Sequence, residues 1–138
     1  MSESILHKTL VQHIIRWIQH YEREIQFVFV DCAENMFMQN IPPLVREYRP
    51  DVYVTTRQDN RVYIGEAKAT LLDLESKHSR EQYLAYLNYC MGRNGILVIA
   101  VPWELANRAK SLIYNLQRQY TLTDVKVEIV DLFQFWGH

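Results

Sequence analysis

Residues 49–68 read RPDVYVTTRQDNRVYIGEAK, and this stretch decides the fold. Its two apolar halves, residues 51–56 and 61–67, are rich in β-branched and aromatic side chains, as is typical of strands. The four residues that join them have the length and composition of a hairpin turn. Pro50 has no backbone N–H to donate, which suits the residue that leads into a strand. The stretch therefore predicts an antiparallel pair of strands.

The segment before this hairpin predicts a helix followed by a strand. Residues 4–21 carry apolar side chains at spacings of three and four, the pattern of an amphipathic helix, and Ser2 or Ser4 would cap it. Residues 25–30 are again β-branched and aromatic, which indicates a strand. Prolines interrupt residues 32–50, so we expect a long loop or a short helical piece there.

The segment after the hairpin adds two helices and two strands. In chain order we expect an irregular connection over residues 71–77, a helix over 79–91 closed by Gly92, a strand over 96–101, a helix that Pro102 opens, and a strand over 125–130. The run at 96–101 is apolar at every position, which places that strand in the middle of a covered sheet. The order predicts an α/β fold, a mixed sheet flanked by helices.

The composition fits one soluble domain. The chain has 138 residues, of which 49% are hydrophobic and 22% charged, so we expect a single domain over residues 1–138. The N-terminus has no signal-peptide pattern, and the longest apolar run, residues 96–102, is too short to span a membrane. A cytoplasmic protein with no membrane partner is therefore expected. Cys32 and Cys90 are isolated, and we interpret them as buried thiols rather than as zinc ligands or a disulfide.

The net charge of −1 argues against a protein that binds nucleic acid over its whole surface. It does not argue against a nuclease, because metal-binding carboxylates lower the formal charge and bound cations restore it locally. A cluster of basic residues lies between positions 46 and 80, although acidic residues are interspersed there. Its members are Arg46, Arg49, Arg57, Arg61, Lys68, Lys77 and Arg80.

Asp51, Glu66 and Lys68 are the candidate catalytic residues. Glu66 and Lys68 lie two apart on one strand, so their side chains leave the same face of the sheet. The antiparallel hairpin brings the start of one strand, Asp51, beside the end of the other. Hydrolysis of a phosphodiester needs divalent cations, which bind carboxylates, and a nearby lysine can stabilise the charged transition state. Ala67 faces the other way, but its carbonyl can be a further metal ligand.

Each part of this pattern also has a purely structural interpretation. Glu-x-Lys on a strand is commonly a solvent-facing ion pair, and Pro-Asp is common in turns. The combination favours chemistry, because Pro50-Asp51 opens one strand while Glu66-Ala67-Lys68 ends its partner.

At these residues the chain resembles the PD-(D/E)xK nuclease superfamily, whose signature matches Pro50-Asp51 and Glu66-Ala67-Lys68. The resemblance covers residues 4–101. It implies a restriction-endonuclease-like core of helix, three strands, helix and strand, and it leaves residues 102–138 as a C-terminal extension with a further helix and strand. It also implies Mg²⁺, with Mn²⁺ as a substitute, as the cofactor.

A second part of the resemblance lies on the helix after the lysine. In the exonuclease-like branch of the superfamily this helix carries Gln-x-x-x-Tyr, and here Gln82 and Tyr86 lie four apart on one helical face. The resemblance implies that this pair holds Lys68 or the substrate phosphate. The alternative is an ordinary helix surface with a half-buried tyrosine.

Many members of the superfamily take one more acidic metal ligand from the first helix. Glu3 is the candidate here, with His7 one turn later on the same face, although a solvated terminus is the structural alternative. The competing carboxylates are Glu22, Glu24 and Glu34.

The other histidines show no ligand spacing. His13 and His20 are expected on the wet face of the first helix. His78 and Arg80 begin the helix of Gln82, where phosphate contact and plain solvation both remain open.

The leading hypothesis is a Mg²⁺-dependent deoxyribonuclease whose site is Asp51, Glu66 and Lys68. A single domain offers one site, so cutting both strands of DNA would need a homodimer. The alternative is a catalytically inactive nuclease-fold module that binds nucleic acid or a protein partner in a larger defence or mobile-element complex. A third hypothesis is an accidental match in an unrelated α/β protein.

Overall fold

The computed structural model describes residues 4–31, 41–57 and 60–132. Their elements are, in chain order, α1 (Ile5–Tyr21), β1 (Ile25–Val30), β2 (Val52–Thr56), β3 (Val62–Ala67), α2 (Leu71–Glu75), α3 (Lys77–Met91), β4 (Ile96–Val101), a 3₁₀ turn η1 (Trp103–Leu105), α4 (Ala106–Gln119) and β5 (Lys126–Asp131). None of the helices in these three ranges is long and apolar enough to cross a membrane.

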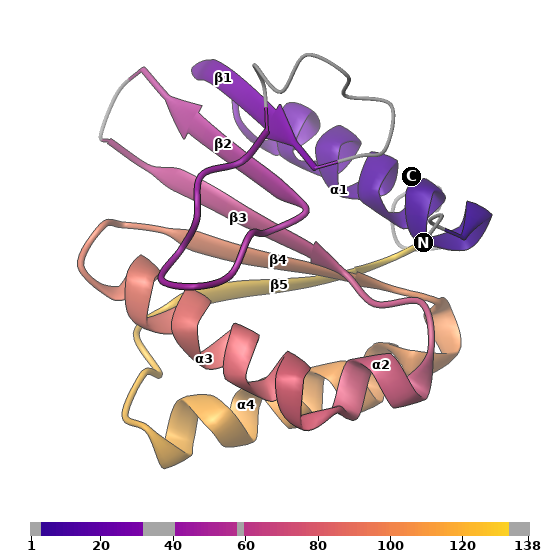
Figure 1. Ribbon diagram of the computed structural model, residues 1–138. Helices are drawn as coiled ribbons and strands as arrows, with labels where there is room; N and C mark the ends of the chain where they lie inside the picture. The colour runs from indigo at the N-terminus through magenta and orange to yellow at the C-terminus, as the bar shows by residue number, and fades with distance from the viewer. Residues whose placement is uncertain (1–3, 32–40, 58–59, 133–138) are drawn as a thin grey trace.

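One mixed sheet of five strands organises the fold. The strands lie in the order β1-β2-β3-β4-β5, with antiparallel pairing from β1 to β3 and parallel pairing from β3 to β5. Helix α1 covers one face of the sheet, and α2, α3 and α4 lie on the other (Figure 1). The expected α/β fold, a mixed sheet flanked by helices, is confirmed.

The hairpin and the central strand form where the sequence predicts them. Val52 pairs with Gly65 and Thr55 with Val62, which sets the antiparallel register of β2 and β3. Strand β4 pairs in parallel with β3 and is buried along its whole length, as its continuous apolar run predicts. Since β3, β4 and β5 run in parallel, their C-terminal ends lie at the same edge of the sheet.

Helix α1 packs closely on the sheet at Gly65. The helix begins after Ser4, whose side chain accepts a hydrogen bond from the His7 N–H (3.0 Å). A Cβ atom at Gly65 would lie 2.7 Å from Ile14 Cγ2 and 3.0 Å from Val52 Cβ. Only a glycine leaves room for this approach. The packing of α1 therefore fixes β3 at the residue that precedes Glu66.

The connection between β3 and α3 is more regular than expected. Residues 71–77, expected to be irregular, contain α2 and the first residue of α3. The Thr70 side chain accepts a hydrogen bond from Asp73 N–H (3.1 Å), and the Ser76 side chain accepts one from Ser79 N–H (3.0 Å). Each hydroxyl satisfies a backbone donor that the first turn of a helix leaves open, so the two helices follow in close succession.

The prediction that His13 lies on the solvent-exposed face of α1 is wrong. His13 is 2% exposed, and its Nε2 lies 2.8 Å from the backbone carbonyl oxygen of Asp131. Burial is the main reason that the pKa of His13 is lowered. Its role is therefore to hold α1 to the end of β5.

The loop that precedes β2 covers part of the α3 side of the sheet. In its described part, residues 41–50, Val45 and Tyr48 form an isolated bridge, and Val45 is fully buried in the same core as Tyr86. Figure 1 shows this loop crossing in front of β2 and β3. The loop thus closes over the sheet next to the start of β2.

Candidate active site

The hairpin brings Asp51 and Glu66 into direct contact. Asp51 directly precedes β2, and the pairing of Val52 with Gly65 puts it opposite Glu66 on β3. The Asp51 N–H donates to Glu66 Oε1 (3.3 Å), and the Ala67 N–H donates to Asp51 Oδ2 (2.8 Å). Glu66 is 4% exposed. Two carboxylates 15 positions apart in the sequence therefore meet at one place, where Glu66 is buried and the Asp51 side chain is 14% exposed.

Lys68 pairs with Glu66 and is held by the helices that follow. Its Nζ lies 3.5 Å from Glu66 Oε2 and donates to Gln82 Oε1 (2.8 Å). It also lies 3.8 Å from Asp73 Oδ1 and 5.8 Å from the centre of the Tyr83 ring. The lysine is only 4% exposed. A buried ammonium thus has a fixed position, set by a short amide contact and flanking carboxylates.

Tyr86 fixes the other side of Glu66. The Tyr86 hydroxyl donates to Glu66 Oε1 (3.2 Å), and the ring is fully buried. Tyr48 from the preceding loop contacts the Tyr86 ring edge to face, with 6.5 Å between ring centres, and contacts His78 in the same way at 5.5 Å. Gln82 and Tyr86, one turn apart on α3, therefore reach the lysine and the glutamate respectively.

The electrostatics of Glu66 are unfavourable for an isolated carboxylate. Burial first, and the negative charge of Asp51 next, hold the pKa of Glu66 well above its usual range. Lys68 and the hydrogen bond from Tyr86 act in the opposite direction and stabilise the ionised form. The net effect of these groups disfavours the ionised form of Glu66.

The residues present fit a divalent cation of the Mg²⁺ type. Within the described ranges, no group of three or more His, Cys, Asp or Glu side chains is arranged to hold a metal ion. Mg²⁺ does not need such a group, because it binds through one or two carboxylates and completes its shell with waters and substrate oxygens. Asp51 and Glu66 are such a pair, and a cation beside them would offset the repulsion between their charges.

Other predicted ligands lie elsewhere or outside the described residues. Glu3 and Glu34 belong to segments that the structure does not describe. Glu22 accepts a hydrogen bond from Tyr63 (2.8 Å) at the opposite end of β3, and the Glu24 carbonyl accepts from Arg57 N–H (2.8 Å) there. Neither Glu22 nor Glu24 contacts Asp51 or Glu66. Ala67 packs on the α1 side of the sheet, as expected.

Two residues at the site were not proposed as site residues from the sequence, although His7 was noted one turn after Glu3. His7 of α1 lies with its Nε2 3.3 Å from Asp51 Oδ2, and Asp73 lies beside Lys68. The pattern Thr70-Leu71-Leu72-Asp73 carries the signal for Asp73, because a hydroxyl residue three positions before an acidic one marks a helix start. His7 had a weaker signal, its position on the helix face assigned to Glu3.

Comparisons of the chain with protein-family models, with curated proteins and with solved structures gave no match. The function of this protein is therefore inferred from the residues of the site.

Proposed function

We propose that this protein is a metal-dependent nuclease that hydrolyses phosphodiester bonds in DNA at Asp51, Glu66 and Lys68. The resemblance of Pro50-Asp51 and Glu66-Ala67-Lys68 to the PD-(D/E)xK signature supports this proposal. The single observation that carries it is the contact between α3 and the hairpin. Gln82 and Tyr86, the second part of the resemblance, bind the lysine and the glutamate of the first.

That contact matters because the two parts of the pattern are independent in sequence. An accidental Glu-x-Lys on a strand has no reason to meet a Gln-x-x-x-Tyr pair from a helix, with both charged side chains about 4% exposed. A solvent-facing ion pair, the structural alternative, leaves its charges in water. Burying them is costly unless each is paired and hydrogen-bonded. Such an arrangement is typical of functional sites.

In the proposed reaction Asp51, Glu66 and the Ala67 carbonyl would hold the cation. When bound, Mg²⁺ would neutralise the phosphate and lower the pKa of the attacking water. Lys68 would orient that water or stabilise the charge that develops on the phosphate oxygens, since Gln82 keeps its ammonium in one place. Tyr86 would hold the Glu66 carboxylate in a single orientation. His78 and Arg80, in the first turns of α3, are candidates for substrate phosphate contact.

The test is DNA cleavage by the purified chain. With Mg²⁺ or Mn²⁺ we expect nicking or degradation in a panel of duplex, single-stranded and branched DNA, and no cleavage in EDTA. Asp51→Ala should abolish the activity. Asp124→Ala, which alters an exposed carboxylate at the opposite end of the sheet, is the matched control and should cut normally. Cleavage that survives EDTA or Asp51→Ala would refute the proposed site.

The alternative is a module of this fold that binds nucleic acid or a protein partner without cutting. The net charge of −1 favours it, because a partner would then supply the DNA affinity. Calorimetry separates the two proposals. Binding of Mn²⁺ that is lost in Asp51→Ala supports the nuclease, and absence of Mn²⁺ binding in the wild type supports the inactive module.

A further inference from the structure

A hollow of about 480 Å³ lies on the sheet at the end of the β2–β3 hairpin that is remote from Asp51. Its volume falls within the range of about 300–1,000 Å³ for pockets that hold small organic groups. The residues that line it and matter here are Phe27, Phe29, Thr55, Arg61, Tyr89 and Arg93. We call this feature the aromatic groove.

A continuous row of rings runs through the aromatic groove. Phe27 lies 6.2 Å from Phe29 between ring centres, Phe29 lies 6.3 Å from Tyr53, and Tyr53 lies 6.2 Å from Tyr89. Tyr53 and Tyr89 are locked together by a hydrogen bond between their hydroxyls (2.7 Å). The outer end of the row is open, because Phe27 is 56% exposed. The hydrogen bond between Tyr53 and Tyr89 therefore fixes the inner part of the row, while the outermost ring, Phe27, is exposed to solvent.

The polar groups of the aromatic groove favour an anionic ligand. The Arg93 guanidinium stacks on Tyr89, 4.0 Å from the ring centre. Arg61 also borders the groove, but its guanidinium lies on the α1 side of the sheet, where it contacts Glu22 at 3.6 Å. Of the described residues that line the groove, none is acidic. One of its buried polar atoms, Thr55 Oγ1, has no hydrogen-bond partner within the described part of the chain. Buried polar atoms of this kind normally find a partner, so they mark a place for a ligand or water.

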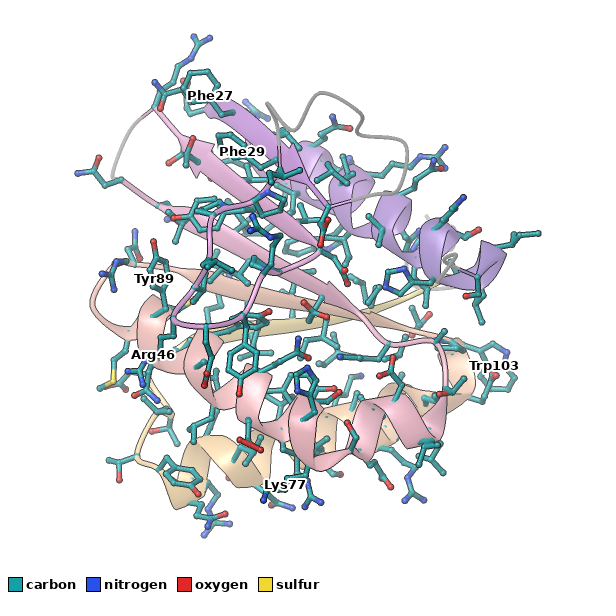
Figure 2. The ribbon with its side chains drawn as sticks, in the orientation of Figure 1. Phe27, Phe29, Arg46, Lys77, Tyr89 and Trp103 are labelled. Carbon is teal, nitrogen blue, oxygen red and sulfur yellow. The ribbon has the colours of Figure 1, made fainter. Side chains whose placement is uncertain are left out.

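The aromatic groove and the candidate active site open on the same face of the sheet. Val62, which lines the groove, and Glu66 lie four residues apart on β3, so both side chains leave the sheet on the α3 side, about 13 Å apart at the rise of a strand. Figure 2 shows Phe27, Phe29 and Tyr89 towards one end of the sheet and Trp103 at the opposite end.

We infer that the aromatic groove binds unpaired bases of the nucleic acid strand that the candidate active site cuts. Bases stack on aromatic side chains irrespective of sequence, and arginines beside the rings bind the phosphates. The enzyme would then prefer a single strand or a frayed end to a blunt duplex, whose paired bases cannot enter the groove. This inference rests on the proposed function, because the strand held for cutting is the one that would occupy the groove.

The test is fluorescence anisotropy with a labelled oligothymidylate of about 12 nucleotides, compared with a blunt duplex of the same length, in EDTA. Wild-type protein should bind the single strand more tightly. Phe27→Ala should weaken that binding by about 5- to 150-fold, the range for loss of one stacked base, and Phe27→Trp should retain it. Arg93→Ala should weaken binding and also reduce its dependence on salt.

The chain offers a matched control for these variants on α4. Tyr114 is 56% exposed and carries Arg118 over its ring at 5.6 Å, with the same spacing in sequence as Tyr89 and Arg93. Tyr114→Ala should leave the affinity unchanged. Unfolding curves of Phe27→Ala should match those of the wild type, since this ring is the exposed member of the row.

The inference and the proposed function fail in different ways. If the wild type and Phe27→Ala bind the single strand equally well, and cleavage still depends on Asp51, the groove does not bind bases. The proposed nuclease activity would then still stand. If binding depends on Phe27 but the chain does not cut DNA with Mg²⁺, base binding by the groove would stand and the proposed nuclease activity would be refuted. If light scattering shows a different molecular mass for Phe27→Ala than for the wild type, while the DNA affinity is unchanged, the groove is an interface between copies of the chain. This result would overturn the inference.

Discussion

Gln82→Ala should reduce catalysis more than its effect on stability accounts for. The substitution removes the amide oxygen that accepts from Lys68 Nζ at 2.8 Å. The lysine side chain is 5% exposed, so water does not replace the lost partner, and Glu66 and Asp73 remain at 3.5 and 3.8 Å. A hydrogen bond to a charged group contributes about 1.5–3 kcal/mol. If Lys68 acts in the transition state, kcat should fall by roughly 10- to 150-fold with little change in KM.

The assay is steady-state cleavage of DNA with Mg²⁺, read together with thermal unfolding. Gln117→Ala is the matched control, because Gln117 is also 9% exposed and its amide donates to the carbonyls of Leu122 and Val125, far from the site. Both variants should lose stability, but only Gln82→Ala should lose kcat. Gln82→Glu retains an acceptor for Lys68 and should keep more activity than Gln82→Ala. Equal kcat in Gln82→Ala and Gln117→Ala would refute the reasoning.

Three further predictions concern stability. Glu66→Gln should abolish cleavage, and its Tm in EDTA relative to that of the wild type should increase as pH rises above the ordinary carboxyl range: the pKa of Glu66 is raised in the fold, so its ionisation destabilises the wild type there, whereas glutamine does not ionise. A Tm difference between the two proteins that does not change with pH would contradict this. Gly65→Ala should cost about 1–3 kcal/mol in urea unfolding because its Cβ would meet Ile14 at 2.7 Å, and an unchanged midpoint would count against the close packing. The pKa of His13 is lowered in the fold, so neutral His13 contributes stability above the unfolded pKa of 6.5, and this contribution is lost as pH falls through the folded pKa. The Tm of the wild type should therefore decline from pH 7 to pH 5, and the Tm of His13→Gln should decline less.

The hairpin was predictable because its information is local. The β-branched and aromatic content of residues 51–56 and 61–67, the turn length and Pro50 together predict an antiparallel pair, and the pair alone brings Asp51 to Glu66. The contacts of Gln82 with Lys68 and of Tyr86 with Glu66 are not local. Helical spacing puts the two side chains on one face, but only the packing of α3 on the sheet decides what that face touches.

The elements that sequence reasoning missed depend on short-range capping or on tertiary packing. Helix α2 has five residues, too few to show the periodic spacing of apolar residues that is typical of a helix. In the sequence, only the capping pair Thr70 and Asp73 indicates it. His13 looked like a surface residue because its partner is a backbone carbonyl at Asp131, 118 residues away. The aromatic groove was likewise not predictable, since Phe27 and Phe29 have the ordinary pattern of a strand and only the tertiary structure shows that Phe27 is 56% exposed.

The central claim is that Lys68 stabilises the transition state of phosphodiester hydrolysis beside Asp51 and Glu66. The most direct test is the single-turnover rate of DNA cleavage by Lys68→Met at saturating Mg²⁺, with Lys126→Met, an exposed lysine at the far end of the sheet, as control. We expect a rate at least about 100-fold below that of the wild type for Lys68→Met and a normal rate for the control. A folded Lys68→Met protein that cuts DNA as fast as the wild type would contradict it.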